Sequence, residues 1–166
     1  MNLAYLDADI IVRGSLAPCM RPVRTRELVC AHDMGNTASE GYCSALLTQD
    51  ERRRAATMLG ANGGFFCARG DRLGTTFDVW EAILAKRRPP FHGGFDQPAL
   101  NAAIVRGQID ADIVSDAMWF PRWHPKSSKP EGRRASTLAP LIHCNTIRRP
   151  YHLMRMAASW TRLRLG

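Results

Sequence analysis

The sequence contains no apolar run long enough to cross a lipid bilayer, a length of about 20 residues. It also lacks a secretory signal, because its first residues lead directly into an apolar segment without a basic stretch or a cleavage site. We therefore expect a cytoplasmic protein without a membrane anchor. Its 166 residues, of which 45% are hydrophobic and 23% charged, fit one globular domain.

CxxC pairs are missing as well, and the number of cysteines is odd. These features fit neither a disulfide framework nor a common zinc site. We expect buried free thiols in a reducing compartment instead. The five cysteines are Cys19, Cys30, Cys43, Cys67 and Cys144.

Acidic residues are scarce in the last third of the chain, where Glu131 is the only one from Ala117 onward. This region contributes strongly to the net charge of +8 and would attract the phosphates of a nucleotide, a nucleic acid or an anionic membrane. A solvated basic surface explains the same charges, so charge alone does not choose between these functions. The basic residues are Arg122, Lys126, Lys129, Arg133, Arg134, Arg148, Arg149, Arg155, Arg162 and Arg164.

Apolar periodicity predicts strands that alternate with helices, which is typical of an α/β fold built in layers. The best helix, over 76–86, has Phe77, Trp80, Ile83 and Leu84 on one side. A stretch over 32–42 is rich in Gly, Asn, Ser and Thr and is expected to be a loop. Strands are expected over 2–9, 27–32, 63–68, 109–114, 118–123 and 138–143, and further helices over 51–58, 96–105 and 151–165.

The apolar strand expected near the N-terminus ends in two carboxylates, Asp7 and Asp9. Asp is disfavoured in strands, whereas Mg²⁺ and Mn²⁺ prefer carboxylate oxygens and bridge them to substrate phosphates. The pair therefore indicates a divalent metal site. An Asp-rich turn is the ordinary alternative, because Asp hydrogen-bonds to its own backbone in turns.

Two further segments combine small and polar residues. The run Asn62-Gly63-Gly64-Phe65-Phe66 contains a step of small residues, which lets the backbone approach another group closely. Taken alone, such a run is more often a turn. Asp96 and Gln97 place a carboxylate and an amide at the start of an expected helix, where Asp is commonly an N-cap.

The strand expected over 138–143 ends in His143, and basic residues follow it closely. By itself such a histidine is more often a satisfied core residue than a ligand. The carboxylates of Asp7 and Asp9 favour the ligand interpretation, because imidazole is a common companion of carboxylates at metal sites.

The motifs YLDAD, NGGFF, DQPALN and IHCN, the last followed by basic residues, occur here in the order found in one family. The sequence resembles the nucleotide-diphospho-sugar transferases of the GT-A fold, of the glycogenin and lipopolysaccharide galactosyltransferase type or the plant arabinosyl and xylosyl transferase type. The resemblance runs from about Leu3 to about Trp160. It implies a three-layer α/β sandwich with a mixed sheet, in which one domain over 1–166 transfers a sugar from a nucleotide-diphosphate donor, most commonly a UDP-sugar, with retention of configuration.

The resemblance also implies a metal site. Asp7 and Asp9 match the two acids of the family's DxD motif, which bind Mn²⁺, or Mg²⁺ in its place, and His143 matches the third protein ligand. Either Arg148 or Arg149 falls near the position where the family binds the diphosphate. The substrate-binding candidates in this region are Asn145, Arg148 and Arg149.

The other two motifs match the family's donor-sugar pocket. Asn62, Gly63 and Gly64 correspond to its asparagine and small residues, and Asp96 and Gln97 correspond to the Asp-Gln pair beside the reacting carbon of the sugar. The resemblance therefore assigns Asp96 and Gln97 to catalysis and the residues over 62–64 to substrate binding.

The sequence departs from the family at its start. Family members carry a further half-domain before the DxD strand, similar in size to a βαβαβ nucleotide-binding unit. We therefore expect an N-terminally truncated fold with an exposed sheet edge and apolar face, and impaired or no activity for the chain alone. A misassigned start or a fragment, a second polypeptide that supplies the missing half, and a degenerate homologue all fit this pattern.

Two other functions stay open. A basic binding module would grip polyanions such as nucleic acid through the Arg-rich C-terminal third, with an affinity that falls with salt and ignores Mn²⁺. An inactive transferase remnant would aggregate or bind hydrophobic dyes. The transferase interpretation predicts metal-dependent binding of a nucleoside diphosphate, lost in Asp9→Asn, and no nucleic-acid partner.

Overall fold

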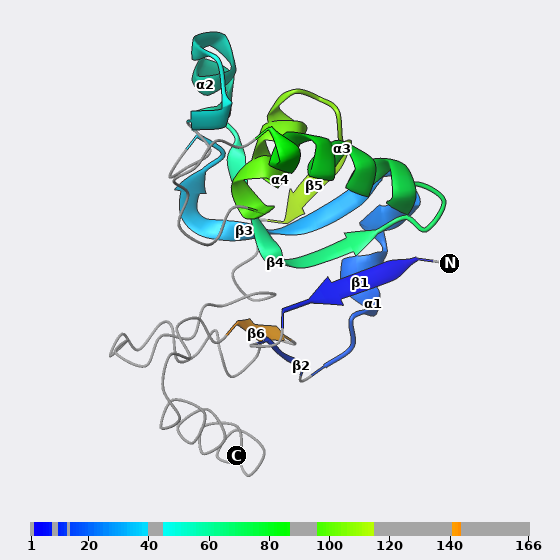
Figure 1. Cartoon of the computed structure of the whole chain (residues 1–166). Coiled ribbons are helices and arrows are strands. Elements are labelled where there is room, and N and C mark those ends of the chain that lie inside the picture. The colour runs from blue at the N-terminus through cyan, green and yellow to red at the C-terminus, as the bar shows by residue number, and fades with distance from the viewer. Residues whose placement is uncertain are drawn as a thin grey trace, which may run out of the picture. The chain divides into compact units, whose positions relative to one another are not determined.

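The computed structural model describes residues 2–7, 10–12, 14–39, 45–86, 96–114 and 141–143 (Figure 1). The chain divides into two compact units. One comprises Met1–Leu6 and Leu16–Ser115, and the other comprises Asp7–Ser15 and Asp116–Gly166. The single domain expected over 1–166 stays a prediction.

A four-stranded sheet lies at the centre of the first unit (Figure 1). Its strands are β1 (Leu3–Leu6), β3 (Leu28–Thr37), β4 (Leu59–Ala68) and β5 (Ala111–Val114). They lie in the order β1-β4-β3-β5. Strand β4 is antiparallel to both of its neighbours, whereas β3 and β5 are parallel. This mixed, open sheet with its helices confirms the α/β class expected from the sequence.

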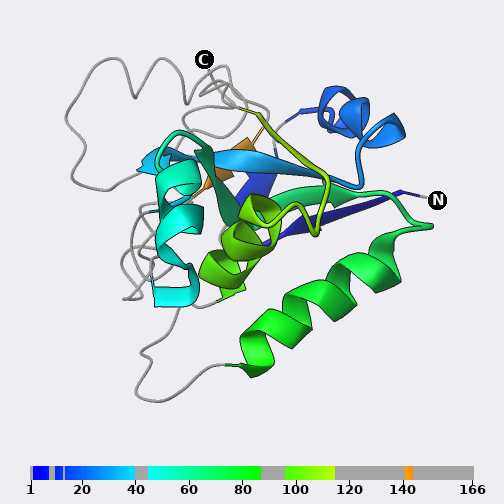
Figure 2. The ribbon, with the colours of Figure 1, turned by 90° about the horizontal axis from the view of Figure 1, so that it is seen from above.

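Two helices, α3 (Leu73–Ala85) and α4 (Asp96–Val105), pack against each other and on one face of the sheet (Figure 2). Helix α4 has the bounds expected from its sequence. A shorter helix, α2 (Gln49–Ala55), lies in the connection between β3 and β4. The segment before β3 contains the short helical turns α1 (Ala17–Met20) and η1 (Pro22–Arg24).

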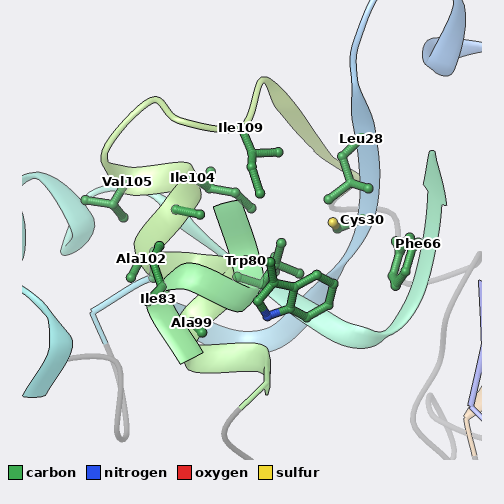
Figure 3. Close-up of a cluster of buried hydrophobic side chains, with 14 of the residues drawn as sticks. Leu28, Cys30, Phe66, Trp80, Ile83, Ala99, Ala102, Ile104, Val105 and Ile109 are labelled. Atoms are coloured by element: carbon green, nitrogen blue, oxygen red, sulfur yellow. The ribbon is translucent and has the colours of Figure 1, made fainter. Parts of the chain in front are cut away.

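The core of the first unit lies between the sheet and the two long helices (Figure 3). Leu28 and Cys30 of β3 and Phe66 of β4 pack with Trp80 and Ile83 of α3. Helix α4 contributes mainly small side chains, which allow its backbone to approach the strands closely. The fully buried residues of α4 are Ala99, Leu100, Ala102 and Ala103.

The structure corrects one expected loop. Strand β3 continues to Thr37, so the loop expected over 32–42 is wrong for 32–37. Strand β4 likewise begins at Leu59, before the stretch expected over 63–68. Both extensions pair irregularly and are rich in glycine and in residues with low strand propensity, so they lack the sustained apolar alternation of a predicted strand. The strand expected over 118–123 and the helix expected over 151–165 lie outside the described residues.

The second unit is described through one antiparallel strand pair, β2 (Ile10–Val12) and β6 (Leu141–His143). Ile10 lies opposite His143 and Val12 lies opposite Leu141. Leu141 is fully buried. The pairing joins segments from the two ends of the sequence within this unit.

Candidate functional site

The pairing of β3 with β4 contains two consecutive register shifts, and the predicted sugar-pocket residues of β4 lie there. Between the pairs Cys30–Phe66 and Ala31–Asn62, one step along β3 matches four steps along β4. Beyond the pair His32–Ala61 the extra residues lie on β3 instead, because the next pair joins Thr37 to Leu59. Bulges of this kind bend strands and redirect side chains, and they are common beside binding sites.

Asp33 lies in the irregular part of β3 and is only 5% exposed. Its carboxylate accepts hydrogen bonds from Asn36 Nδ2 at 2.7 Å and from Gln97 Nε2 at 2.9 Å. A longer contact of 3.4 Å joins it to Asn62 Nδ2. A buried carboxylate is costly unless donors satisfy it, so these amides stabilise a negative group inside the fold.

Side-chain carboxamides also bind the backbone of β4 around its glycine step. Gly63 N donates to Gln97 Oε1 at 3.0 Å, and Gly64 N donates to Asn62 Oδ1 at 2.8 Å. Asn62 is 2% exposed. A Cβ at Gly63 would lie 3.2 Å from Gln97 Cβ, which is tighter than an ordinary van der Waals contact. The missing side chain lets the first turn of α4 approach β4.

The start of α4 is held from two sides. Trp80 Nε1 of α3 donates to the backbone oxygen of Asp96 at 2.7 Å, and Asp96 Oδ1 accepts from the backbone N of Gln97 at 2.9 Å. Asp96 is exposed and Gln97 is half-buried. A carboxylate therefore stands at the surface beside the carboxamide that reaches Asp33.

Four residues predicted from the sequence thus belong to one polar cluster with Asp33, called the Asp33 cluster below. They are Asn62, Gly63, Gly64 and Gln97. Asp96 adjoins this cluster through Gln97. Carboxylate oxygens accept from hydroxyl groups and carboxamides both donate and accept. In this cluster these groups hydrogen-bond mainly to one another inside the fold, and half-buried Gln97 is its most exposed member.

Sequence reasoning missed Asp33, although a signal was present. The apolar run Leu28–Ala31 ends in His32 and Asp33, in the same way as the first strand ends in Asp7. Asp33 is a single carboxylate, however, whereas the first strand is followed by the pair Asp7 and Asp9, so the signal is weaker here. The expected loop over 32–42 concealed it.

The expected metal ligands belong to the second unit. Ile10 N donates to Asp7 O at 3.0 Å, and Ile10 lies opposite His143 in the β2–β6 pair. The backbones of Asp7 and His143 are thus both joined to Ile10, the residue that follows Asp9.

The remaining predicted residues are Asp9, Asn145, Arg148 and Arg149, which lie outside the described residues. Within the described ranges, no group of three His, Cys, Asp or Glu side chains is arranged to hold a metal ion. No helix in those ranges is long and apolar enough to cross a membrane.

No protein-family model matches this sequence, and no curated protein is significantly similar to it. The function is therefore inferred from the chemistry of the Asp33 cluster and from the motifs that supply its residues.

Proposed function

We propose that this chain is a metal-dependent glycosyltransferase domain that binds a nucleotide-diphosphate sugar, with a UDP-sugar as the first candidate, in a GT-A-like fold. One observation carries the proposal. Asn62, Gly63 and Gln97, which the family resemblance assigns to a donor-sugar pocket from two separate motifs, belong to one hydrogen-bonded cluster around Asp33. The strand register and the placement of α4 put them together, and neither depends on the resemblance.

The chemistry of this cluster suits a sugar. Carboxylates and carboxamides are the groups that accept from and donate to sugar hydroxyls, and Gln97 is the half-buried member of this cluster. Exposed Asp96 adjoins the same cluster. A carboxylate there would stabilise positive charge that develops at the reacting carbon of the sugar, as carboxylates do in glycoside chemistry.

The proposal also includes a metal site. Asp7, Asp9 and His143 would hold Mn²⁺ or Mg²⁺, and the pairing of Ile10 with His143 supports this assignment. When bound, the metal would stabilise the negative charge of the departing nucleoside diphosphate. Arg148 or Arg149 would add positive charge at the same group.

Isothermal titration calorimetry with UDP and with UDP-sugars, in Mn²⁺ or in EDTA, tests the proposal. Binding should require the metal and should weaken about tenfold or more in Asp7→Asn and Asp9→Asn. Asp112→Asn is the matched control, because Asp112 is exposed on β5 and belongs to none of the four motifs. Circular dichroism should show the same folded content in all variants.

Three results would reject the transferase assignment. Equal binding with and without metal would remove the role of Asp7 and Asp9. Binding to nucleic acid that ignores metal and falls steeply with salt would favour the basic module. A folded protein that binds neither UDP nor UDP-sugars would favour the inactive remnant.

A further inference from the structure

Asn101 is a buried carboxamide on α4, one turn after Gln97, and is 5% exposed. Its Oδ1 accepts from Ala61 N at 2.8 Å, and its Nδ2 donates to Ala61 O at 2.9 Å. The same Nδ2 donates to Gln97 O at 3.0 Å. A single side chain therefore binds both backbone polar groups of Ala61 and the backbone of Gln97.

The place of Ala61 in the sheet explains this arrangement. The β1–β4 pairing reaches only Leu6, opposite Phe65, whereas β4 continues back to Leu59. A carboxamide presents the same donor and acceptor as a peptide group. Asn101 thus acts toward Ala61 as a neighbouring strand would, at the part of β4 beyond the end of β1.

Both residues that Asn101 binds, Ala61 and Gln97, adjoin or belong to the Asp33 cluster. Ala61 directly precedes Asn62, so its bonds to Asn101 fix the strand where the glycine step begins. Gln97 carries the side chain that accepts from Gly63 and donates to Asp33. Asn101 therefore fixes the distance between the backbones of Ala61 and Gln97, on which the hydrogen bond from Gly63 N to Gln97 depends.

We propose that Asn101 is a positioning residue, which sets the geometry of the Asp33 cluster through the backbones of Ala61 and Gln97 without touching the ligand itself. Its effect on the cluster follows from hydrogen bonds within the protein. Its effect on sugar binding rests on the proposed function.

Asn101→Asp is the informative variant because it is nearly isosteric. It keeps the acceptor for Ala61 N but places an oxygen against the carbonyls of Ala61 and Gln97, where the amide donated. Gln108→Glu is the matched control, because Gln108 is exposed just after the same helix. Asn101→Ser, which keeps one small donor, serves if the aspartate variant does not fold.

NMR of the labelled protein should report the change directly. In Asn101→Asp, the Gly63 amide should exchange about tenfold faster than in wild type, whereas the exchange rate of the Val29 amide in the central strand should stay the same. The Gln97 side-chain amide signals should also shift. A carboxylate facing two carbonyls titrates with a raised pKa, so lowering the pH to about 5 should restore much of the Gly63 protection. Gln108→Glu should show none of these effects.

Two outcomes would overturn the proposal. The Gly63 and Gln97 signals could stay unchanged in a folded variant, or all core amides could lose protection equally, and either result leaves Asn101 an ordinary core residue. A second measurement links it to function: affinity for UDP-sugar should fall while affinity for UDP stays constant. If the wild-type chain binds no UDP-sugar, the proposed function fails, and the NMR result still decides the role of Asn101.

Discussion

At the scale of single residues, the hydroxyl of Thr76 is the least satisfied buried side-chain group among the described residues. This side chain of α3 is 3% exposed, and its Oγ1 has no hydrogen-bond partner in the part of the chain that the structure describes. A buried hydroxyl without a partner keeps its desolvation cost, which amounts to about 1–3 kcal/mol. Thr76→Val preserves the shape of the side chain and removes that cost.

We therefore expect Thr76→Val to raise the free energy of unfolding by about 1 kcal/mol in urea titrations. Thr75→Val is the control, because Thr75 is exposed and its Oγ1 donates to Arg72 O at 2.9 Å. That variant should gain nothing. A clear loss of stability in Thr76→Val would mean that a bound water satisfies the hydroxyl.

The family resemblance identified part of the candidate site. Asn62 and Gln97 were predicted through the order of the motifs, because taken alone the 62–64 run is more often a turn and Asp96 more often an N-cap. Asp33 carried only the weak signal of a carboxylate after an apolar run. Its contacts, like those of Asn101, depend on a strand register that the sequence does not reveal. The partners of Asn101 lie 40 positions away at Ala61 and within its own helix at Gln97.

At the scale of elements, one ion pair ties α2 to α4. Arg106 Nε donates to Glu51 Oε1 at 3.0 Å, and the second Arg106 nitrogen donates to Leu46 O at 2.6 Å. Glu51 also closes a capping box with Thr48 at the start of α2. The hydrogen bond from Arg106, with a second from the Thr48 backbone, lowers the pKa of Glu51 from 4.5 to about 2.

This lowered pKa makes the stability contribution of Glu51 depend on pH. The folded protein favours the charged form, so the contribution is complete above about pH 4.5 and is lost as the pH falls toward about 2. Glu51→Gln keeps an acceptor for the cap but removes the charge. Its free energy of unfolding should lie below wild type by on the order of 1 kcal/mol at neutral pH, and the gap should close in acid.

Urea titrations of both proteins across this pH range measure the gap. Asp50→Asn provides the control, because Asp50 pairs with Arg53 on a fully solvated part of the same helix. That change should cost less than about 0.5 kcal/mol at any pH. A gap for Glu51→Gln that does not vary with pH would mean that the charge of Glu51 contributes nothing.

The elements also show which patterns carry structural information. Helix α4 could be predicted with its bounds because Leu100 and Ile104 lie on one side of it and Pro98 falls in its first turn after Asp96. The extended parts of β3 and β4 could not, because bulges break the two-residue period on which strand prediction depends. The same bulges create the Asp33 cluster, so the region hardest to predict is the one with the most distinctive chemistry.

At the scale of the whole molecule, the β1 edge of the described sheet carries exposed apolar side chains. Strand β1 ends the strand order, and Leu3 and Tyr5 remain 37% and 42% exposed. Tyr5 stacks on Phe66 at 4.9 Å between ring centroids, and Phe66 meets Phe77, which is 40% exposed, at 6.1 Å. Natural edge strands usually carry Lys, Pro or a bulge against association, and the sequence Leu-Ala-Tyr-Leu of β1 has none of these.

An apolar edge of this kind should associate with itself or with other apolar surfaces. We expect the wild-type chain to bind a hydrophobic dye and to show an apparent mass that rises with concentration in sedimentation experiments. Tyr5→Lys should reduce both, because a lysine desolvates poorly against another strand. It should also lower the free energy of unfolding by about 1 kcal/mol, since the stacking on Phe66 is lost. Thr75→Lys adds the same charge at an exposed site on α3 and should change neither property, whereas equal effects of the two lysines would assign the association to net charge and not to the β1 edge.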